Sequence, residues 1–330
     1  MHGGQAMTLN GSRVLVTGGA GFVGSNLVRR LMQEGARVTV LDDLFTGRRE
    51  NLPDDGIEFV EGSVCDPPTV EHLVALADVV FHCAARNIVA STRSPRDDFE
   101  TNIGGTLNLL LAARATGNVR RIVYTSSTSV YGNPRYLPIN EDDHLSLLTP
   151  YAVSKLSGEH YCTAFFESYG MPTTAVRYSN IFGPGQDPDN PYCGVVAKFA
   201  DALFDGRPPM IHGDGNQTRD FTYIDDAVEA TLLAATSDRA LGEVFNVGTG
   251  METRVNELAA ILIRLIGAKV TPQHTNRRDV DNIRRRVVNI EKTRRALRWV
   301  PEVTLEEGLR RTVEWQKNSS LKARGASTRG

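Results

Sequence analysis

A glycine-rich turn between a short apolar run and a helical pattern is the feature that most constrains the fold of this 330-residue chain. The apolar run Val14–Thr17 leads into Gly18, Gly21 and Gly24, which have G-x-x-G-x-x-G spacing. In a strand–turn–helix unit, the first glycine permits the tight turn, the second lets the backbone approach a pyrophosphate, and the third lets the helix pack close to the strand. The free N–H groups at the helix N-terminus also attract phosphate. The turn therefore predicts a dinucleotide site that includes Gly18, Gly21, Phe22, Val23 and Gly24.

An acidic pair, Asp42 and Asp43, follows the second predicted strand, Val38–Leu41. A carboxylate about 20 residues beyond such a glycine turn is placed to accept hydrogen bonds from a ribose diol. The same carboxylate would repel a 2′-phosphate, so the pair favours NAD over NADP as the cofactor. Arg48 and Arg49 would suit a 2′-phosphate, but we interpret them as solvated charges of a loop.

Strand-like and helix-like segments alternate along the first half of the chain. Such alternation predicts a parallel sheet with helices on both faces. The predicted helices include Thr106–Ala115 and Pro150–Tyr169, and the predicted strands are Val14–Thr17, Val38–Leu41, Ile57–Val60, Val79–Cys83, Ile122–Thr125 and Thr173–Tyr178.

The pattern changes after Asn180, where a loop rich in Pro and Gly begins. We expect a doubly wound parallel Rossmann sheet in residues 11–179, joined by about 219–250. A smaller, discontinuous α/β lobe from residues 180–218 and 251–317 would bind the substrate, and residues 1–10 and 318–330 are predicted to be flexible. The elements predicted beyond Asn180 are Val195–Phe204, Pro209–Ile211, Phe245–Val247, Val255–Ile266 with Thr253 as its N-cap, and Leu305–Gln316.

Charge and hydropathy argue against several classes of function. The formal net charge is −2, so no overall basic field attracts nucleic acid or an anionic membrane. No apolar run is long enough to span a bilayer, and the first ten residues lack a hydrophobic signal core, so we expect a cytoplasmic protein. The four cysteines have no metal-ligand spacing. We therefore expect no metal site and interpret the cysteines as buried free thiols.

Tyr151 and Lys155 are four residues apart in a predicted helix and hence share one face. Upstream, strand Ile122–Thr125 leads into Ser126-Ser127-Thr128-Ser129, at the edge of a parallel sheet where ligands bind. A phenol with a pKa of about 10 is a poor base at neutral pH, but a nearby ammonium favours the phenolate. The pattern predicts that Tyr151 moves the proton of a substrate hydroxyl while hydride leaves its carbon for NAD. Lys155 and the positive nicotinamide ring would lower the pKa of Tyr151, and Ser127 would hydrogen-bond the same substrate oxygen.

Together these motifs resemble the extended short-chain dehydrogenase/reductases that act on nucleotide sugars, the NAD-dependent epimerases and dehydratases. The resemblance runs from about Arg13 to Gln316, and it includes Gly62-Ser63-Val64-Cys65-Asp66, Arg177-Tyr178-Ser179-Asn180 and the stretch from Gly213 to Phe221. It implies that Asp66 contacts the adenine of NAD and that the chain forms a homodimer through two helices of the large domain. The other implied NAD contacts are Ala84, Ala85, Asn102, Tyr151 and Lys155.

A missing acid indicates the reaction within this group. Members that dehydrate or decarboxylate have an acid after the catalytic hydroxyl, since eliminating water needs a general acid, but here Ser129 occupies that place. The stretch resembles UDP-sugar 4-epimerases, and the chain as a whole most closely a UDP-glucuronate 4-epimerase. The resemblance implies that UDP-glucuronate is oxidised at C4, turned as a 4-keto sugar and reduced to UDP-galacturonate. The alternatives are UDP-glucose as the substrate, a decarboxylase or dehydratase with its acid elsewhere, and a non-catalytic NAD-binding protein.

The resemblance also implies which residues hold the substrate. A C6 carboxylate would need a cationic partner, for which Arg86 and Arg93 are the candidates. The basic run 284–286 is interpreted as part of a strand in the lobe. The remaining implied contacts are Ser127 and Thr128 for the sugar, Asn180, Arg219 and Arg278 for the diphosphate, and Asp281 for the nucleotide ribose.

Overall fold

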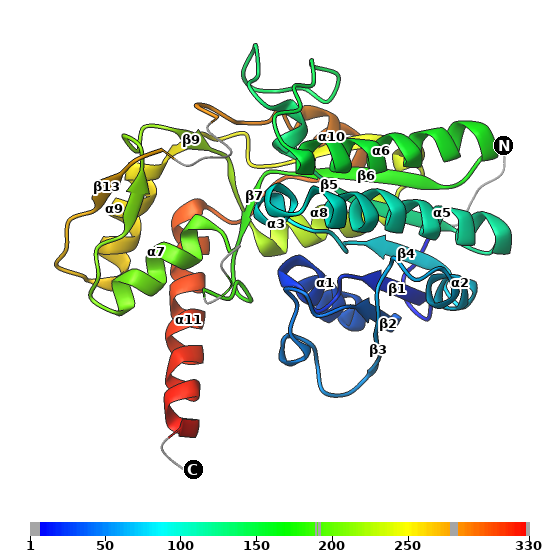
Figure 1. Ribbon diagram of the computed structural model, residues 1–330, viewed down its shortest axis with the longest axis horizontal. Helices are drawn as coiled ribbons and strands as arrows, with labels where there is room; N and C mark the ends of the chain where they lie inside the picture. The colour runs from blue at the N-terminus through cyan, green and yellow to red at the C-terminus, as the bar shows by residue number, and fades with distance from the viewer. Residues whose placement is uncertain (1–6, 189, 191–192, 278–282, 328–330) are drawn as a thin grey trace.

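A seven-stranded parallel sheet forms the centre of the part of the chain that the structure describes (Figure 1). The structure is a computed structural model and describes residues 7–188, 190, 193–277 and 283–327, with side chains up to residue 318. The strand order is β11-β6-β5-β4-β1-β2-β3. The strands are β1 (Arg13–Thr17), β2 (Arg37–Asp42), β3 (Ile57–Glu61), β4 (Val79–His82), β5 (Arg121–Ser127), β6 (Thr173–Tyr178) and β11 (Val244–Val247).

The strand order reverses between β1 and β4. From β1 the chain moves outward through β2 and β3, then crosses back to β4 and continues through β5, β6 and β11. Because all these pairings are parallel, the carboxyl ends of the strands meet at one edge, and ligands of such sheets bind beyond that edge at the reversal. The glycine turn after β1, Asp42 at the end of β2 and Ser127 at the end of β5 all lie at this edge.

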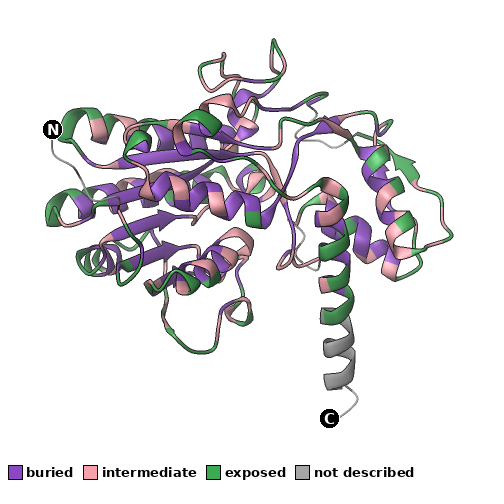
Figure 2. Cartoon of the chain, turned by 180° about the vertical axis from the view of Figure 1, so that it is seen from behind, coloured by how far each residue is buried: buried purple, intermediate pink, exposed green. Residues whose placement is uncertain are grey.

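Helices cover both faces of the sheet, as a doubly wound fold requires (Figures 1 and 2). Val14 and Val16 of β1 join one hydrophobic cluster, whereas Leu15 joins the other, because successive strand residues point to opposite faces. The first cluster contains residues of α1 (Phe22–Gln33) and α8 (Ile224–Thr236). The second contains residues of α2 (Pro67–Ala75), α5 (Gly105–Thr116) and α6 (Pro150–Tyr169).

A smaller group of elements lies beside the sheet rather than on its faces (Figure 1). Its helices are α7 (Val195–Phe204), α9 (Val255–Ile266) and the long α11 (Leu305–Ser327), and α7 packs against α9. Three two-stranded sheets accompany them: β7 (Asn180–Phe182) with β10 (Phe221–Tyr223), β9 (Thr218–Arg219) with β12 (Thr253–Arg254), and β8 (Met210–His212) with β13 (Gln273–Thr275). The shorter helical segments are η1 (Arg49–Asn51), α3 (Ile88–Arg93), α4 (Pro95–Asp98), the π-helix η2 (Phe99–Gly104), η3 (Thr128–Tyr131), η4 (Asp238–Ala240) and α10 (Glu291–Leu297).

Several local predictions differ from the structure. The N-cap of α9 is Arg254, because Thr253 pairs with Arg219 in a short sheet. Helix α11 continues past the predicted end at Gln316 to Ser327. Leu9 is buried in the core, so the described end of the first ten residues belongs to the fold.

The basic run 284–286 is not a strand. Arg284 instead pairs with Asp214 at 2.7 Å and Arg285 with Glu252 at 2.5 Å, so their charges hold the segment against the turn before β9 and the one before β12.

All four cysteines are free, as predicted, but burial holds fully only for Cys162, and Cys65 is exposed. The described helices include none with the length and apolar character needed to cross a membrane.

Candidate active site

The glycine turn has the geometry that its spacing predicts. Gly18 has a φ of +68°, in the region that favours glycine, and an added Cβ would lie 2.5 Å from Ala84 N. A Cβ on Gly24 would lie 2.2 Å from Gly18 O, so only glycine lets α1 pack this closely. Gly21 is the N-cap of α1, and no side chain caps the helix. The N–H groups of the first turn of α1 are therefore placed to bind a phosphate.

Asp42 ends β2 beside this turn with its carboxylate buried. Its Oδ2 accepts a hydrogen bond from Ala20 N at 2.8 Å, and its Oδ1 accepts one from Leu44 N at 2.8 Å. Burial raises the pKa of this carboxyl group, while the two backbone hydrogen bonds act in the opposite direction. Each oxygen retains a second lone pair, so the carboxylate can still accept hydrogen bonds from a ribose diol.

A first cavity of about 320 Å³ joins the turn to the predicted catalytic residues. Sequence reasoning missed part of its lining, including Phe45, Thr46 and Gly47, although these follow the acidic pair directly. The predicted residues that line it are Gly18, Gly21, Phe22, Val23, Gly24, Asp42, Asp43, Ala84, Ala85, Arg86, Ser127, Tyr151 and Lys155.

Ser127, Tyr151 and Lys155 are brought together from the end of β5 and the first turns of α6. Thr149 caps α6, since its hydroxyl oxygen accepts a hydrogen bond from Ala152 N at 3.1 Å. The Ser127 hydroxyl accepts a hydrogen bond from Ser129 N and donates one to Ser129 Oγ, both at 3.1 Å. The predicted triad is thus held by a helix cap and by a tight turn after β5.

Burial dominates the acid–base properties of this triad. It raises the pKa of the Tyr151 phenol to about 12, although the hydrogen bond with Ser127 acts in the opposite direction. It also lowers the pKa of Lys155 to about 8. The Lys155 ammonium lies 4.6 Å from the centroid of the Tyr124 ring. Desolvation of the phenol is thus the main cause of the raised pKa of Tyr151, and a lowering by Lys155 together with the positive nicotinamide ring stays a prediction.

A second cavity of about 310 Å³ lies among the elements beside the sheet. Asn180 and Arg219, the predicted diphosphate contacts, both line it. Arg219 Nη1 donates hydrogen bonds to Thr218 O and Ile283 O, each at 2.8 Å, which fixes the guanidinium in place. Arg278 and Asp281 lie outside the described residues. The cations in its lining are Lys198, Arg219, Arg277 and Arg284, and the one acid among the described lining residues is Asp214.

Comparison with known proteins finds matches over most of the chain. The profile of the NAD dependent epimerase/dehydratase family matches residues 14–248. The UDP-glucose 4-epimerase of Mycolicibacterium smegmatis is 40% identical over 315 residues, which cover 93% of this chain and 99% of that protein.

This chain belongs to the NAD-dependent epimerase/dehydratase family.

Solved structures agree with this assignment. The UDP-glucose 4-epimerase of Thermotoga maritima, solved with UDP-glucose, has a TM-score of 0.89 and 38% identity, with 93% of this chain and 99% of that chain covered.

A UDP-glucuronate 4-epimerase from Thermodesulfobacterium geofontis is 32% identical over 320 residues, which cover 92% of this chain and 96% of that protein. The expected closest resemblance to a UDP-glucuronate 4-epimerase is therefore not supported, since UDP-glucose 4-epimerases share more of the sequence.

NAD is the cofactor of this family member, and the first cavity fits it. Gly21 exposes backbone N–H groups where a pyrophosphate would approach, and the buried Asp42 can accept from a ribose. Together these residues provide the donors and acceptors that a dinucleotide requires.

Three residues that were predicted to contact NAD or the sugar do not line the first cavity. Asp66 caps α2, since its carboxylate accepts hydrogen bonds from the Thr69 N–H at 3.3 Å and from the Thr69 hydroxyl. Thr128 is buried at the start of η3. Asn102 holds the backbone of the segment after β4, with Arg86 N donating to its Oδ1 at 2.7 Å and its Nδ2 donating to Arg86 O at 3.0 Å. Asn102 therefore holds the backbone of Arg86 in place.

A buried carboxylate supports the helix of the triad in this family member. Asp98 Oδ1 accepts hydrogen bonds from Ser91 Oγ at 2.5 Å, Asn102 Nδ2 at 2.7 Å and Ser154 Oγ at 2.9 Å. Ser154 immediately precedes Lys155 on α6. Four elements therefore meet at one carboxylate, which fixes α6 against α3, α4 and η2.

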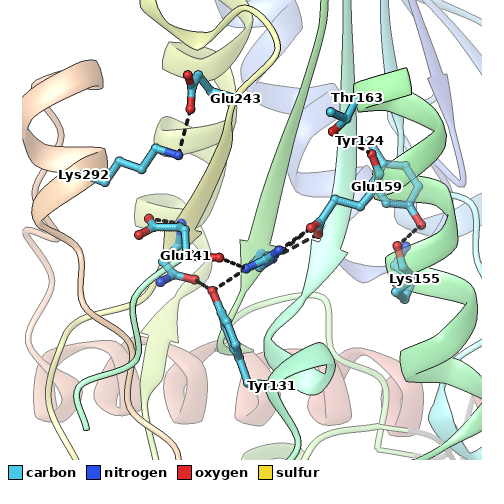
Figure 3. A network of polar contacts seen from close by, with 10 residues as sticks. Tyr124, Tyr131, Glu141, Lys155, Glu159, Thr163, Glu243 and Lys292 are labelled. Carbon is cyan, nitrogen blue, oxygen red and sulfur yellow. Dashed lines mark hydrogen bonds and ion pairs between the residues drawn. The ribbon is translucent and has the colours of Figure 1, made fainter. Parts of the chain in front are cut away.

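A second buried network ties the same helix to β6 (Figure 3). Arg177 of β6 pairs with Glu159 of α6, and its Nη1 also donates to Tyr131 Oη at 2.8 Å and to Glu141 O at 2.7 Å. Tyr131 Oη in turn donates to Asn246 Oδ1 at 2.6 Å. This network thus connects helix α6, which carries Tyr151, to the segment after Ser127 and to strand β11.

Proposed function

We propose that this protein is an NAD-dependent UDP-sugar 4-epimerase whose substrate pair is UDP-glucose and UDP-galactose. The observation that carries the proposal is the composition of the first cavity around the triad. Among its described lining residues, the only acids are Asp42 and Asp43, which lie at the end of β2. Ser129 forms a hydrogen bond with Ser127 in place of an acid. The cavity therefore has a proton carrier in Tyr151, but none of its described lining residues near the triad is a carboxylate that could protonate a leaving hydroxyl of the sugar.

The residues of the triad divide the chemistry at C4. When bound, NAD supplies the hydride acceptor and donor at that carbon. Tyr151 takes the proton from O4 during oxidation and returns it during reduction, while Ser127 hydrogen-bonds the same oxygen. Because burial favours the neutral phenol, the phenolate needs nearby positive charge, and Lys155 is the cation that lines the cavity beside Tyr151.

The second cavity is suited to the nucleotide diphosphate. We propose that residues 180–218 and 251–317 form the substrate lobe, in which Asn180 and Arg219 contact the diphosphate. Four cations against one acid in the described lining favour an anionic ligand. A sugar that must present both faces to the nicotinamide cannot be held tightly, so the remote nucleotide is expected to supply most of the binding energy.

The choice of an uncharged sugar rests on sequence similarity to UDP-glucose 4-epimerases and on the ion pair that Arg86 forms. Two relatives named UDP-glucose 4-epimerases are 40% and 38% identical to this chain, whereas the UDP-glucuronate 4-epimerase is 32% identical. Arg86, the expected partner of a C6 carboxylate, forms an ion pair with Asp43 instead. Arg93 lines neither of these two cavities. No other arginine among the described residues lines the first cavity, which favours a C6 hydroxymethyl group over a carboxylate.

A product assay tests this function. The protein is incubated with UDP-glucose and, separately, with UDP-glucuronate, and the products are separated by epimer-resolving chromatography with mass detection. We expect an isobaric new peak from UDP-glucose and a much smaller one from UDP-glucuronate. A peak from UDP-glucuronate alone would overturn the choice of sugar, and loss of water or carbon dioxide would overturn the 4-epimerase assignment.

A homodimer remains a prediction from the resemblance. The outer faces of α5 and α6 expose Leu111, Val153 and Tyr161, and apolar side chains of this kind favour burial against a second copy. Sedimentation of the wild type and of Leu111→Glu tests this. We expect a dimer that the added charge converts to a monomer, and a monomeric wild type would contradict the prediction.

A further inference from the structure

Arg86 and Asp43 form a bidentate ion pair in the first cavity. Arg86 Nη2 lies 2.7 Å from Asp43 Oδ2, and Nη1 lies 3.4 Å from Oδ1. The guanidinium carbon also lies 4.0 Å from the centroid of the Phe45 ring. The two side chains are only 16% and 29% exposed, so solvent screens this pair less than an open surface pair.

The two residues reach each other across the glycine turn. Arg86 follows β4 and Asp43 follows β2, and β1 lies between these strands. Neighbouring strands are about 4.8 Å apart, so the pair crosses the carboxyl end of β1, where the glycine turn leaves the sheet. Both side chains line the same cavity as Gly18 and Gly21. The ion pair therefore spans the groove that the dinucleotide would occupy.

The backbone beneath Arg86 is held in place, which leaves the side chain as the movable part. Asn102 hydrogen-bonds both the N–H and the carbonyl oxygen of Arg86. The Arg86 Nε is buried and has no hydrogen-bond partner among the described residues. A buried donor without an acceptor is costly, so this N–H points to a ligand group that completes it.

We propose that Arg86 and Asp43, with the Phe45 ring against the guanidinium, form a clasp that closes over bound NAD and slows both its entry and its release. The inference concerns the cofactor of the family and does not depend on which sugar the enzyme converts. It reassigns Arg86 from the sugar to the dinucleotide. A reaction that returns NAD to its starting state in every turnover has no need to exchange the cofactor, so slow release is compatible with catalysis.

Binding kinetics of the full chain test the clasp. Association and dissociation rates of NADH are measured by stopped-flow fluorescence, with excess NAD as the displacing ligand. For Asp43→Asn we expect both rates to rise about tenfold, because loss of a charge-assisted hydrogen bond of this kind opens the groove. In an Arg86→Gln background, Asp43→Asn should change neither rate further, since the clasp is already open.

A matched ion pair provides the control. Arg13 and Asp78 pair at 2.6 Å at the opposite end of β1 and β4, so Arg13→Gln should leave both rates unchanged. If NADH dissociated faster from Asp43→Asn but associated at an unchanged or slower rate, Asp43 would contact NADH directly. That result would overturn the clasp. Unchanged rates in Asp43→Asn would also overturn it, as would an effect of Asp43→Asn that persists in the Arg86→Gln background. No arm uses a sugar substrate, so failure here is distinct from failure of the proposed reaction.

Discussion

Arg177 of β6 and Glu159 of α6 form a buried ion pair in which Arg177 Nε lies 3.2 and 3.1 Å from the two carboxylate oxygens of Glu159. Their side chains are 4% and 2% exposed. Figure 3 shows Glu159 one turn beyond Lys155 on the same helix. The pair with Arg177 therefore holds the helix that carries Tyr151 and Lys155 against β6.

Glu159→Gln is expected to destabilise the protein by about 3–5 kcal/mol, since it leaves the Arg177 charge buried without its counter-ion. Urea unfolding at pH 7 measures this. The control is Glu34→Gln, which breaks an exposed pair with Arg30 on α1 and should cost less than about 1 kcal/mol. Equal losses in the two variants would contradict a structural role for the buried pair.

Tyr151→Phe is expected to reduce turnover of UDP-glucose by at least about 100-fold, because the change removes the phenol that carries the O4 proton in the proposed reaction. Initial rates in the product assay measure the loss. Tyr169→Phe, at the exposed end of the same helix, is the matched control and should retain turnover. A Tyr151→Phe enzyme with normal turnover would favour a different proton carrier.

Lys155→Met is expected to stabilise the protein at pH 7 while abolishing activity. Burial lowers the pKa of Lys155 from 10.5 to about 8, so the folded state holds the charged form at a cost below pH 8. Between pH 8 and pH 10.5 the unfolded chain binds more protons at Lys155 than the folded chain does. The free energy of unfolding of the wild type therefore rises with pH over this range, as the cost of burying the charge disappears. At 1.36 kcal/mol per pKa unit the effect is at most about 3 kcal/mol.

Urea unfolding of the wild type and of Lys155→Met at several pH values checks this. The advantage of Lys155→Met should be largest at or below pH 8 and should shrink towards pH 10.5. An advantage that stays constant over this range would mean that the charge of Lys155 carries no net cost in the folded state.

Gly24→Ala is expected to weaken NAD binding at least about tenfold and to destabilise the fold by about 1–3 kcal/mol, because the added Cβ would lie 2.2 Å from Gly18 O. Equilibrium NADH binding and urea unfolding measure the two effects. Gly104→Ala is the control: an added Cβ there would come no closer than 3.8 Å to Phe99 O, so the change should be tolerated. Normal NADH binding by Gly24→Ala would contradict the close packing of turn and helix.

Arg219→Gln is expected to weaken the binding of UDP at least about tenfold, since it removes a positioned charge from the second cavity. Isothermal titration with UDP alone gives the affinity. Arg264→Gln, which removes an exposed arginine of α9 paired with Glu306, should bind UDP normally. If Arg219→Gln also binds UDP normally, the diphosphate lies elsewhere.

Short-range patterns in the sequence were sufficient to predict the central fold and the core of the site. Helix α6 and strand β6 have the predicted bounds, because their apolar periodicity reflects burial against a continuous sheet. The roles of Gly18 and Gly24 follow from a local turn, and the placement of Tyr151 and Lys155 follows from a spacing of one helical turn.

Only the tertiary structure decided which distant side chains meet. Arg86 pairs with Asp43, 43 residues away, because β1 lies between the strands that carry them, and no local pattern encodes that reach. Asp66 caps its own helix instead of lining the cavity, and Arg284 satisfies its charge with Asp214 rather than in a strand. The raised pKa of Tyr151 likewise depends on desolvation by the whole fold, which outweighs the hydrogen bond with Ser127. Sequence alone thus determined the elements and the chemical groups, while packing determined their partners and their protonation, because burial and long-range contact exist only once the chain has folded.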